Sequence, residues 1–371
     1  MATRLVFIFI LSIVLFNPVF AQDENLNSHK TEKKFKLYGD FRFRGESDRN
    51  SKRTDGSYRN DRDRLRYRLR FGFRYNYNEH FELGGRLRSG NPLNQQSPHV
   101  TIGDNFRPDE ISIDKAYLKY TYSNYWIWGG KNNMPFWRQN EMLWDDDVTP
   151  EGISTGGEFQ ITNDQHLSYV LGYYIANRSE KKFNDTGNLI IAQLIFNTNN
   201  NDQKLTASSG FIFGNNLQNI PVPVDSFFMN YKIWASSVQY KWNHFIFGAD
   251  LYFNLENYDN NPDIHDVYKD QKTGYTGSIK YTINKIQFGY CYAHIEKYAV
   301  IDYFAQDDWL RWGTPTFTRS SNFKGHEFKA RYHINSQFNI TFRSWLVNGI
   351  VTTGSHLESG NRFRLDLNFK F

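Results

Sequence analysis

Five arginines occupy alternate positions within residues 61–75 of the chain. Arg62, Arg64, Arg66, Arg68 and Arg70 are interleaved with Asp63, Leu65, Tyr67 and Leu69, and the apolar series continues through Phe71, Phe73 and Tyr75. In a β-strand, neighbouring side chains point to opposite faces, so the guanidinium groups share one face and the apolar side chains share the other. The charged face needs water, and guanidinium groups pair well with carboxylate and phosphate oxygens. The pattern therefore predicts a wetted wall that attracts anionic solutes.

The same alternation places further arginines in other segments. They are Arg42 and Arg44, Arg86 and Arg88, and Arg362 and Arg364, with Lys329, Arg331 and Arg343 as an extension. If the sheet closes into a barrel, its last strand lies beside its first, and these side chains form one basic surface. An arginine that faced lipid at the membrane midplane would instead cost about 2–4 kcal/mol. The alternative hypothesis is that the arginines are structural charges of the lumen, paired with Asp40, Asp61, Asp63 and Glu82.

Residues 1–21 are typical of a secretory leader. Arg4 supplies the positive start, residues 5–16 the apolar core and residues 19–21 a small-residue cleavage site. We expect the polar residues 22–34 to form a lead-in to the folded domain. Beyond the leader, no stretch approaches the roughly 18 apolar residues that a membrane-spanning helix needs. Aromatic residues make up 18 % of the chain and recur at alternate positions, which favours a membrane barrel.

Short turns and long loops alternate along residues 35–371, which we interpret as one domain. We predict about sixteen strands, at 35–46, 62–76, 80–89, 110–121, 125–131, 155–161, 166–175, 188–197, 203–213, 230–241, 244–255, 272–283, 286–297, 323–334, 337–346 and 361–371. The alternation predicts an all-β fold, a transmembrane antiparallel β-barrel with short periplasmic turns and long extracellular loops. Strands 110–121 and 188–197 alternate poorly, and a bulge near Asp114 and Lys115 would explain the first.

The long connection at residues 132–154 combines acidic and aromatic side chains. Its carboxylates are Glu141, Asp145, Asp146, Asp147 and Glu151, and its large aromatics are Phe136, Trp137 and Trp144. An exposed loop rarely has this apolar content, so we expect the segment to fold into the lumen as a constriction, with its acids facing the arginines. Two alternatives are an exposed acidic tip and a Ca²⁺ site at residues 145–147, although consecutive aspartates lack the spacing of an EF-hand loop.

No motif for catalysis, a cofactor or a metal appears in the sequence. The ten histidines show no HExxH spacing, and no GxSxG turn is present. Cys291 is the single cysteine, so no disulfide can form within the chain. Nucleic acid is excluded as a partner because the chain is exported and its basic residues follow a strand period. Two alternatives to a channel stay open: a barrel enzyme, such as a lipase or protease with scattered catalytic residues, and a non-conducting surface or adhesin barrel.

The chain ends in an alternating pattern that closes on an aromatic residue. Phe363, Leu365, Leu367, Phe369 and the terminal Phe371 alternate with polar residues. This ending resembles the assembly signal of Gram-negative outer-membrane proteins. We therefore expect the barrel-assembly machinery and outer-membrane lipid to be partners, and the outer membrane of a Gram-negative bacterium to be the location.

Several segments together resemble the putative porin family of outer-membrane channels. They are residues 38–44, the ladder at 64–70, Arg86 followed by residues 89–92, residues 113–120, and the run from Gly130 and Lys131 through 135–136 and 143–145 to 150–152. The resemblance is dense over residues 38–160. It implies a general-porin barrel, passive diffusion of small hydrophilic solutes and a homotrimer, and it brings no catalytic residue. With the arginine ladder, it leads to the hypothesis of an anion-preferring porin, which conductance in planar bilayers would separate from the enzyme and adhesin alternatives.

Overall fold

The computed structural model describes residues 34–177, 186–200, 203–218, 228–314 and 317–371. Its first strands are β1 (Phe35–Lys52), β2 (Arg62–Asn76), β3 (Phe81–Ser89), β4 (Val100–Thr101), β5 (Ile111–Tyr122), β6 (Tyr125–Lys131), β7 (Glu151–Thr162), β8 (Gln165–Asn177) and β9 (Gly187–Asn200). They are followed by β10 (Gln203–Gln218), β11 (Phe228–Trp242), β12 (Phe245–Asn254), β13 (Thr273–Ile283), β14 (Ile286–Ile295), β17 (Phe323–His333), β18 (Phe338–Gly349) and β19 (Ser359–Lys370). Short elements are the helix α2 (Asp266–Lys269) and the paired strands β15 (Gly313–Thr314) and β16 (Phe317–Thr318).

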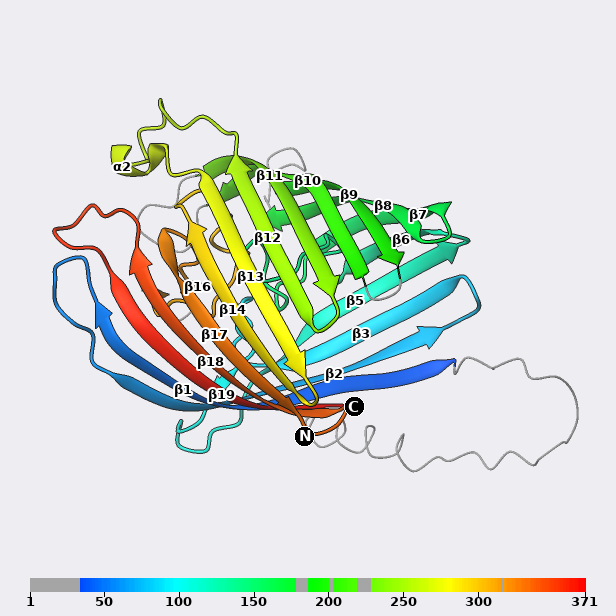
Figure 1. Ribbon diagram of the computed structural model, residues 1–371, viewed down its shortest axis with the longest axis horizontal. Coiled ribbons are helices and arrows are strands. Elements are labelled where there is room, and N and C mark those ends of the chain that lie inside the picture. Colours follow the sequence, from blue (N-terminus) through cyan, green and yellow to red (C-terminus); the bar gives the residue numbers. More distant parts are fainter. Residues whose placement is uncertain (1–33, 178–185, 201–202, 219–227, 315–316) are drawn as a thin grey trace, which may run out of the picture. The chain divides into compact units, whose positions relative to one another are not determined.

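The long strands form one closed antiparallel barrel, as the sequence predicts. Each strand pairs with the next along the chain, and β1 pairs with both β2 and β19, which closes the ring (Figure 1). Sixteen strands of the described chain span the wall, and the two-residue β4 adds a short pairing with β2. Closure satisfies the backbone hydrogen bonds of every strand within the wall, which a bilayer core requires. No helix in the described part of the chain is long and apolar enough to cross a membrane.

The alternation predicted for the strands appears as two distinct faces. On the outer face, Leu65, Leu118, Leu171 and Phe328 are each about half exposed, as expected for side chains that contact lipid. On the inner face, Arg44 and Arg364 are almost completely buried. The wall therefore has the apolar exterior and charged interior that the period of two requires.

Several observed strands extend beyond their predicted ends. β1 runs on to Lys52 and β7 begins at Glu151, so the third long connection is residues 132–150 rather than 132–154. Both extensions are made by pairing with neighbouring strands, β19 and β6, which local sequence does not reveal. Arg86 of β3 pairs with Lys115 of β5, and the next residue, Leu87, pairs with Ile113. Asp114 is therefore an extra residue in β5, and the predicted bulge is confirmed. The expected leader, and the lead-in up to residue 33, lie outside the described residues.

Part of the barrel wall is apolar on both faces. In β9, Leu189, Ile191 and Ile195 are buried inside, while Ile190 and Leu194 are exposed outside. The inner residues belong to one hydrophobic cluster with side chains from two long connections, residues 132–150 and 296–322. Within that cluster, the Trp144 and Phe304 rings stack 4.8 Å apart. One face of β9 packs on this cluster and the other is the apolar exterior of the barrel, which explains why residues 188–197 fail to alternate.

The terminal Phe371 fastens the end of the barrel to β1. Its carbonyl oxygen accepts a hydrogen bond from the Gly39 amide at 3.0 Å, and its own amide donates to the Gly39 carbonyl at 3.1 Å. Its ring lies over Gly39, where an added Cβ would come within 2.4 Å of the ring, and beside Phe369 and Phe71.

Deletion of Phe371 is expected to reduce the amount of assembled barrel, because it removes both the aromatic end of the chain and the last contacts of the closing seam. Export should be unaffected. Heat-modifiable migration of the unboiled protein on a gel measures assembly, and conversion of Lys370 to Gln is the matched control. Wild-type amounts of assembled deletion variant would show that the terminal ring has no role in assembly.

Candidate functional site

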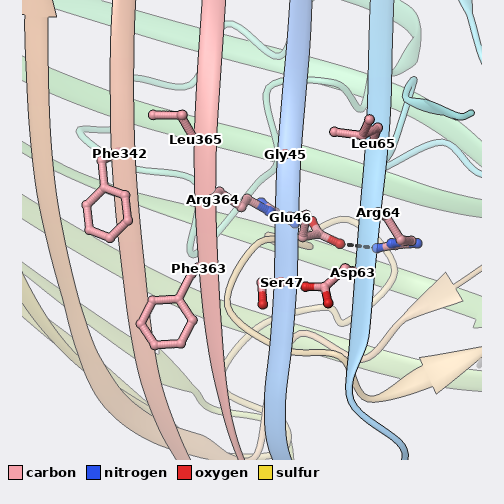
Figure 2. Close-up of a pocket in the computed structure, with 10 residues that line it drawn as sticks. All are labelled: Gly45, Glu46, Ser47, Asp63, Arg64, Leu65, Phe342, Phe363, Arg364 and Leu365. Atoms are coloured by element: carbon pink, nitrogen blue, oxygen red, sulfur yellow. Dashed lines mark hydrogen bonds and ion pairs between the residues drawn. The ribbon is translucent and has the colours of Figure 1, made fainter.

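The inward-facing arginines of the wall pair with acids that lie on β1 and on other strands and loops. We call these arginines the arginine ladder: Arg42, Arg44, Arg62, Arg64, Arg66, Arg68, Arg70, Arg86, Arg88, Arg362 and Arg364. Glu46 of β1 pairs with Arg64 of β2 on one side and with Arg364 of β19 on the other, at 2.5 Å for the second pair (Figure 2). Asp48 repeats this arrangement one step along β1, at 2.7 Å from both Arg62 and Arg362. Because inward positions of β1 align with those of both neighbours, each carboxylate is shared by two guanidinium groups.

A second group of acids holds the arginines of β1, β18 and β19. Arg44 donates to Asp366 through two guanidinium nitrogens, at 2.6 and 3.2 Å, and the third lies 3.9 Å from Asp308. Asp308 also pairs with Arg364 and, at 3.0 Å, with Arg343. Asp308 lies in the connection 296–322, outside the strands, where burial opposes its charge but these three arginines hold its pKa well below the usual range.

One acid of the loop 132–150 reaches the ladder. Asp147 lies 2.5 Å from Arg70 and 3.3 Å from Arg68, and both arginines also pair with Asp40 at 2.7 Å. Burial raises the pKa of the Asp147 carboxyl, but Arg68 and Arg70 lower it by more. The net result is a pKa below the usual value. Asp147 is therefore ionised at neutral pH.

The remaining ladder arginines have other partners. Arg86 donates to Asp114, the bulged residue, at 2.5 Å. Arg42 donates to the amide oxygen of Asn368 at 2.7 Å, and Arg88 donates to the backbone carbonyls of Asn94 and Gln95. No salt bridge joins Arg42 or Arg88 to a carboxylate of the described chain.

The acids named in the alternative hypothesis are only partly the right ones. Asp40 does pair with the ladder. Asp61 and Asp63 instead contact Arg49, at 3.8 and 2.7 Å, and Glu82 accepts a hydrogen bond from the Tyr117 hydroxyl at 2.8 Å. Glu46, Asp48 and Asp366 also pair with the ladder arginines, because the three acids alternate in phase with the arginines of their own strands.

The other predicted loop acids do not converge on the ladder. Asp146 pairs with Arg138 of its own loop, and Glu151, now in β7, pairs with the neighbouring Lys131 at 2.6 Å. Asp145 accepts a hydrogen bond from the Asp147 amide at 2.7 Å. Burial and then the charge of Asp146 raise the pKa of Glu141 to about 8, and burial and Glu141 raise that of Asp145. Within the described residues, no cluster of three or more His, Cys, Asp or Glu side chains could hold a metal ion.

The loop 132–150 contacts inward-facing side chains of several strands. Besides β2, it reaches β9, where Gln193 accepts from the Trp137 amide at 2.6 Å. It also reaches β12, where Asp250 accepts from Gln139 at 2.8 Å and from Asn140 at 2.6 Å. These strands lie at separate points of the ring.

A second connection, residues 296–322, also reaches the charged wall and was missed in the sequence. It supplies Asp308 to Arg364 and Arg343, and its Phe304 carbonyl accepts from the Asp145 amide at 2.7 Å. Buried Trp309, Leu310 and Trp312 anchor it. The signal was present, because this connection has the mix of aromatics and aspartates that drew attention to residues 132–154.

The raised pKa of Asp307 predicts that the charge of the wall depends on pH. Burial and then the neighbouring Asp308 raise the pKa of Asp307 to about 6, against the opposing effect of Arg364 and Arg66. Asp307 loses its negative charge as the pH falls below this value. We therefore expect the anion-to-cation permeability ratio to rise by about twofold on acidification from neutral pH to about pH 5. Asp307→Asn should show a smaller rise in reversal-potential measurements, and an equal rise would exclude Asp307 as the titrating group.

Solved structures of outer-membrane proteins share this architecture at low sequence identity. They include OprB of Pseudomonas putida (11 % identity, 91 % of this chain and 94 % of that chain, TM-score 0.56) and OmpF of Salmonella typhi in complex with daunomycin (12 %, 91 % and 97 %, 0.56). A third is the trimer form of OmpT of Vibrio cholerae (11 %, 91 % and 99 %, 0.53). No curated protein matches the sequence.

A closed barrel of sixteen strands with an apolar exterior and a charged interior defines a porin-type channel of the Gram-negative outer membrane. The family model described as "Putative porin" matches residues 56–277, more than half of the sequence. The chain belongs to the putative porin family.

Proposed function

We propose that the protein is a passive channel for small hydrophilic anions and performs no covalent chemistry. The observation that carries the proposal is the sharing of carboxylates along the inner wall. Glu46 serves both Arg64 and Arg364, and Asp48 serves both Arg62 and Arg362. One negative charge between two positive ones leaves a positive excess, which raises the local concentration of anions and lowers that of cations.

The reversal potential of the purified protein in a KCl gradient tests this proposal. Stepwise channel openings with a reversal potential on the chloride side are expected. A potential on the potassium side would contradict the anion preference, and a barrel that never conducts would contradict the channel itself. The gradient is best made at about 0.1 M salt, where the Debye length of about 10 Å lets ions sense the wall.

We infer that the loop 132–150 forms the constriction of this channel. Its contacts with β2, β9 and β12 support a path across the lumen, because side chains on the inner faces of separate strands can reach one segment only inside the ring. Asp147 then lies opposite the arginines where the passage is narrowest. Charges of opposite sign across a narrow opening would select solutes by charge and orientation.

We further propose a homotrimer whose interface includes the outer face of β1. Gly45 points outward and leaves a notch of about 430 Å³ between Leu65 and Leu365, its partners on the two adjacent strands (Figure 2). Asp63, at the edge of the notch, forms a 2.7 Å ion pair with Arg49 on the same outer face. An ion pair on this face is better accommodated by a second copy of the chain than by acyl chains. The solved trimer of OmpT supports this assembly by its fold.

Gly45→Leu should weaken the trimer because the side chain would fill the notch. Gly277→Leu is the matched control, since Gly277 also lies on an exposed part of a strand, β13, with open space where a Cβ would lie. The fraction of trimer on unboiled gels and by mass measurement in detergent is the readout. Equal trimer fractions for both variants would place the interface elsewhere.

A further inference from the structure

A cavity of about 460 Å³ lies on the long-loop side of the contact between Asp147 and the ladder. It is enclosed by β2, β19 and the connections 90–99 and 307–312. Seven arginines line it: Arg62, Arg64 and Arg66 from β2, Arg362 and Arg364 from β19, and Arg59 and Arg311 from loops. Among the described residues, Asp307 is the one acidic side chain in its lining. We call this cavity the arginine chamber.

The acids behind the arginine chamber do not neutralise it. Glu46 and Asp48 each pair with two of its arginines, and Arg364 shares Asp308 with Arg44 and Arg343. Glu358 is shared between Arg59, at 3.0 Å, and Arg319. Arg311 donates to the Asn60 carbonyl at 2.6 Å and forms no salt bridge with a described carboxylate. The chamber therefore holds more than one uncompensated positive charge.

Two of the side chains that line the arginine chamber are about nine-tenths buried. Arg66 is 8 % exposed and His99 is 9 % exposed. Arg66 donates through one terminal nitrogen to Ser97 at 3.1 Å and to the His99 carbonyl at 3.2 Å, and its nearest carboxylate oxygen, on Glu46, is 3.9 Å away. The Arg66 Nε and the His99 Nε2 have no hydrogen-bond partner in the described chain, and neither has the Arg64 Nε. Buried polar groups are almost always satisfied, so the hydrogen-bonding capacity of these chamber residues is not used up within the described chain.

We propose that the arginine chamber binds a small divalent oxyanion, such as phosphate or sulfate, on its way through the channel. Several oxygens on one compact anion match several guanidinium forks at once, and two negative charges match the positive excess. A halide is one atom with a single charge, so it cannot offer separate oxygens to several guanidinium groups. The inference rests on the proposed function, because it names the class of solute for which the anion-preferring wall is built. Binding must be weak enough for the anion to leave, as conduction requires.

Inorganic phosphate at about pH 8, where it is divalent, is the probe. It is added to a single channel in KCl at constant ionic strength, and sulfate is the second probe. The chloride current should fall in a saturable manner with either anion. In the double variant Arg66→Gln with Arg311→Gln, the half-blocking concentration should rise by about tenfold, which corresponds to about 1.4 kcal/mol of binding free energy. Arg107→Gln, which removes an exposed loop arginine paired with Asp104, should match the wild type.

The outcomes separate the binding site from the anion preference. An anion-selective channel whose chloride current shows no saturable block would overturn the arginine chamber as a binding site and leave the proposed function intact. Block that is unchanged in the double variant would do the same. A wild-type channel that prefers potassium would overturn the proposed function. Gel migration before and after heating shows whether each variant is folded, and Arg311→Gln alone, in a loop, provides a test if the double variant fails to assemble.

Discussion

Deletion of residues 137–147 is expected to increase the single-channel conductance severalfold and to admit larger solutes. The deletion removes Trp144 and Asp147, which are respectively the aromatic anchor of the loop in the luminal cluster and its contact with the ladder. The residues left, 132–136 and 148–150, can still join β6 to β7, because Lys131 and Glu151 are directly paired. The pore would then be bounded by the wall and by the connection 296–322.

A second deletion controls for loop shortening in general. Residues 103–107 are exposed, so their removal should leave the conductance unchanged. Exclusion of sugars of increasing size measures the width of the opening independently of its charge. A folded 137–147 deletion variant with wild-type conductance would show that the loop does not narrow the passage.

Replacement of Arg66, Arg68 and Arg70 by Gln should shift the reversal potential strongly toward cation preference. The change removes three positive charges and also frees Asp40 and Asp147, which pair with Arg68 and Arg70. The field of the wall should therefore change sign in this region. The shift should shrink at about 1 M salt, where the Debye length falls to about 3 Å.

Asp147→Asn should shift the reversal potential in the opposite direction, toward anions, because it removes the negative charge while Arg68 and Arg70 keep Asp40. Arg107→Gln serves as the control, since Arg107 is exposed in a loop and pairs with Asp104. If the triple variant assembles and conducts with wild-type ion preference, the arginines are structural lining, and the selectivity arises elsewhere.

The architecture could be predicted from local patterns because every strand of a membrane barrel must alternate apolar and polar side chains with a period of two residues. Leu65 and Arg66 must face different solvents wherever the strand lies in the ring. The bulge at Asp114 was also visible, since it interrupts the alternation of β5. The extension of β1 to Lys52 was not, because residues 47–52 are polar and their strand structure comes from pairing with β19, more than three hundred residues away in sequence.

The site was less accessible from the sequence. Alternation identifies the inward arginines and would also have identified Glu46 and Asp48, which follow Arg44 in phase. It cannot say that Asp63 contacts Arg49, because that contact depends on the register between β1 and β2. The role of Asp308 depends on the path of a long loop, and loop paths are determined by packing across the molecule.

The hydrophobic cluster within the barrel separates two properties that often vary together in a channel. The loops that border the passage are held partly by contacts such as that between Trp144 and Phe304, and dissolved ions do not screen such contacts. The preference among ions comes from charges, which dissolved ions do screen. Such a pore keeps its diameter at high salt concentration while its ion selectivity decreases. Each of these two properties can be altered without changing the other.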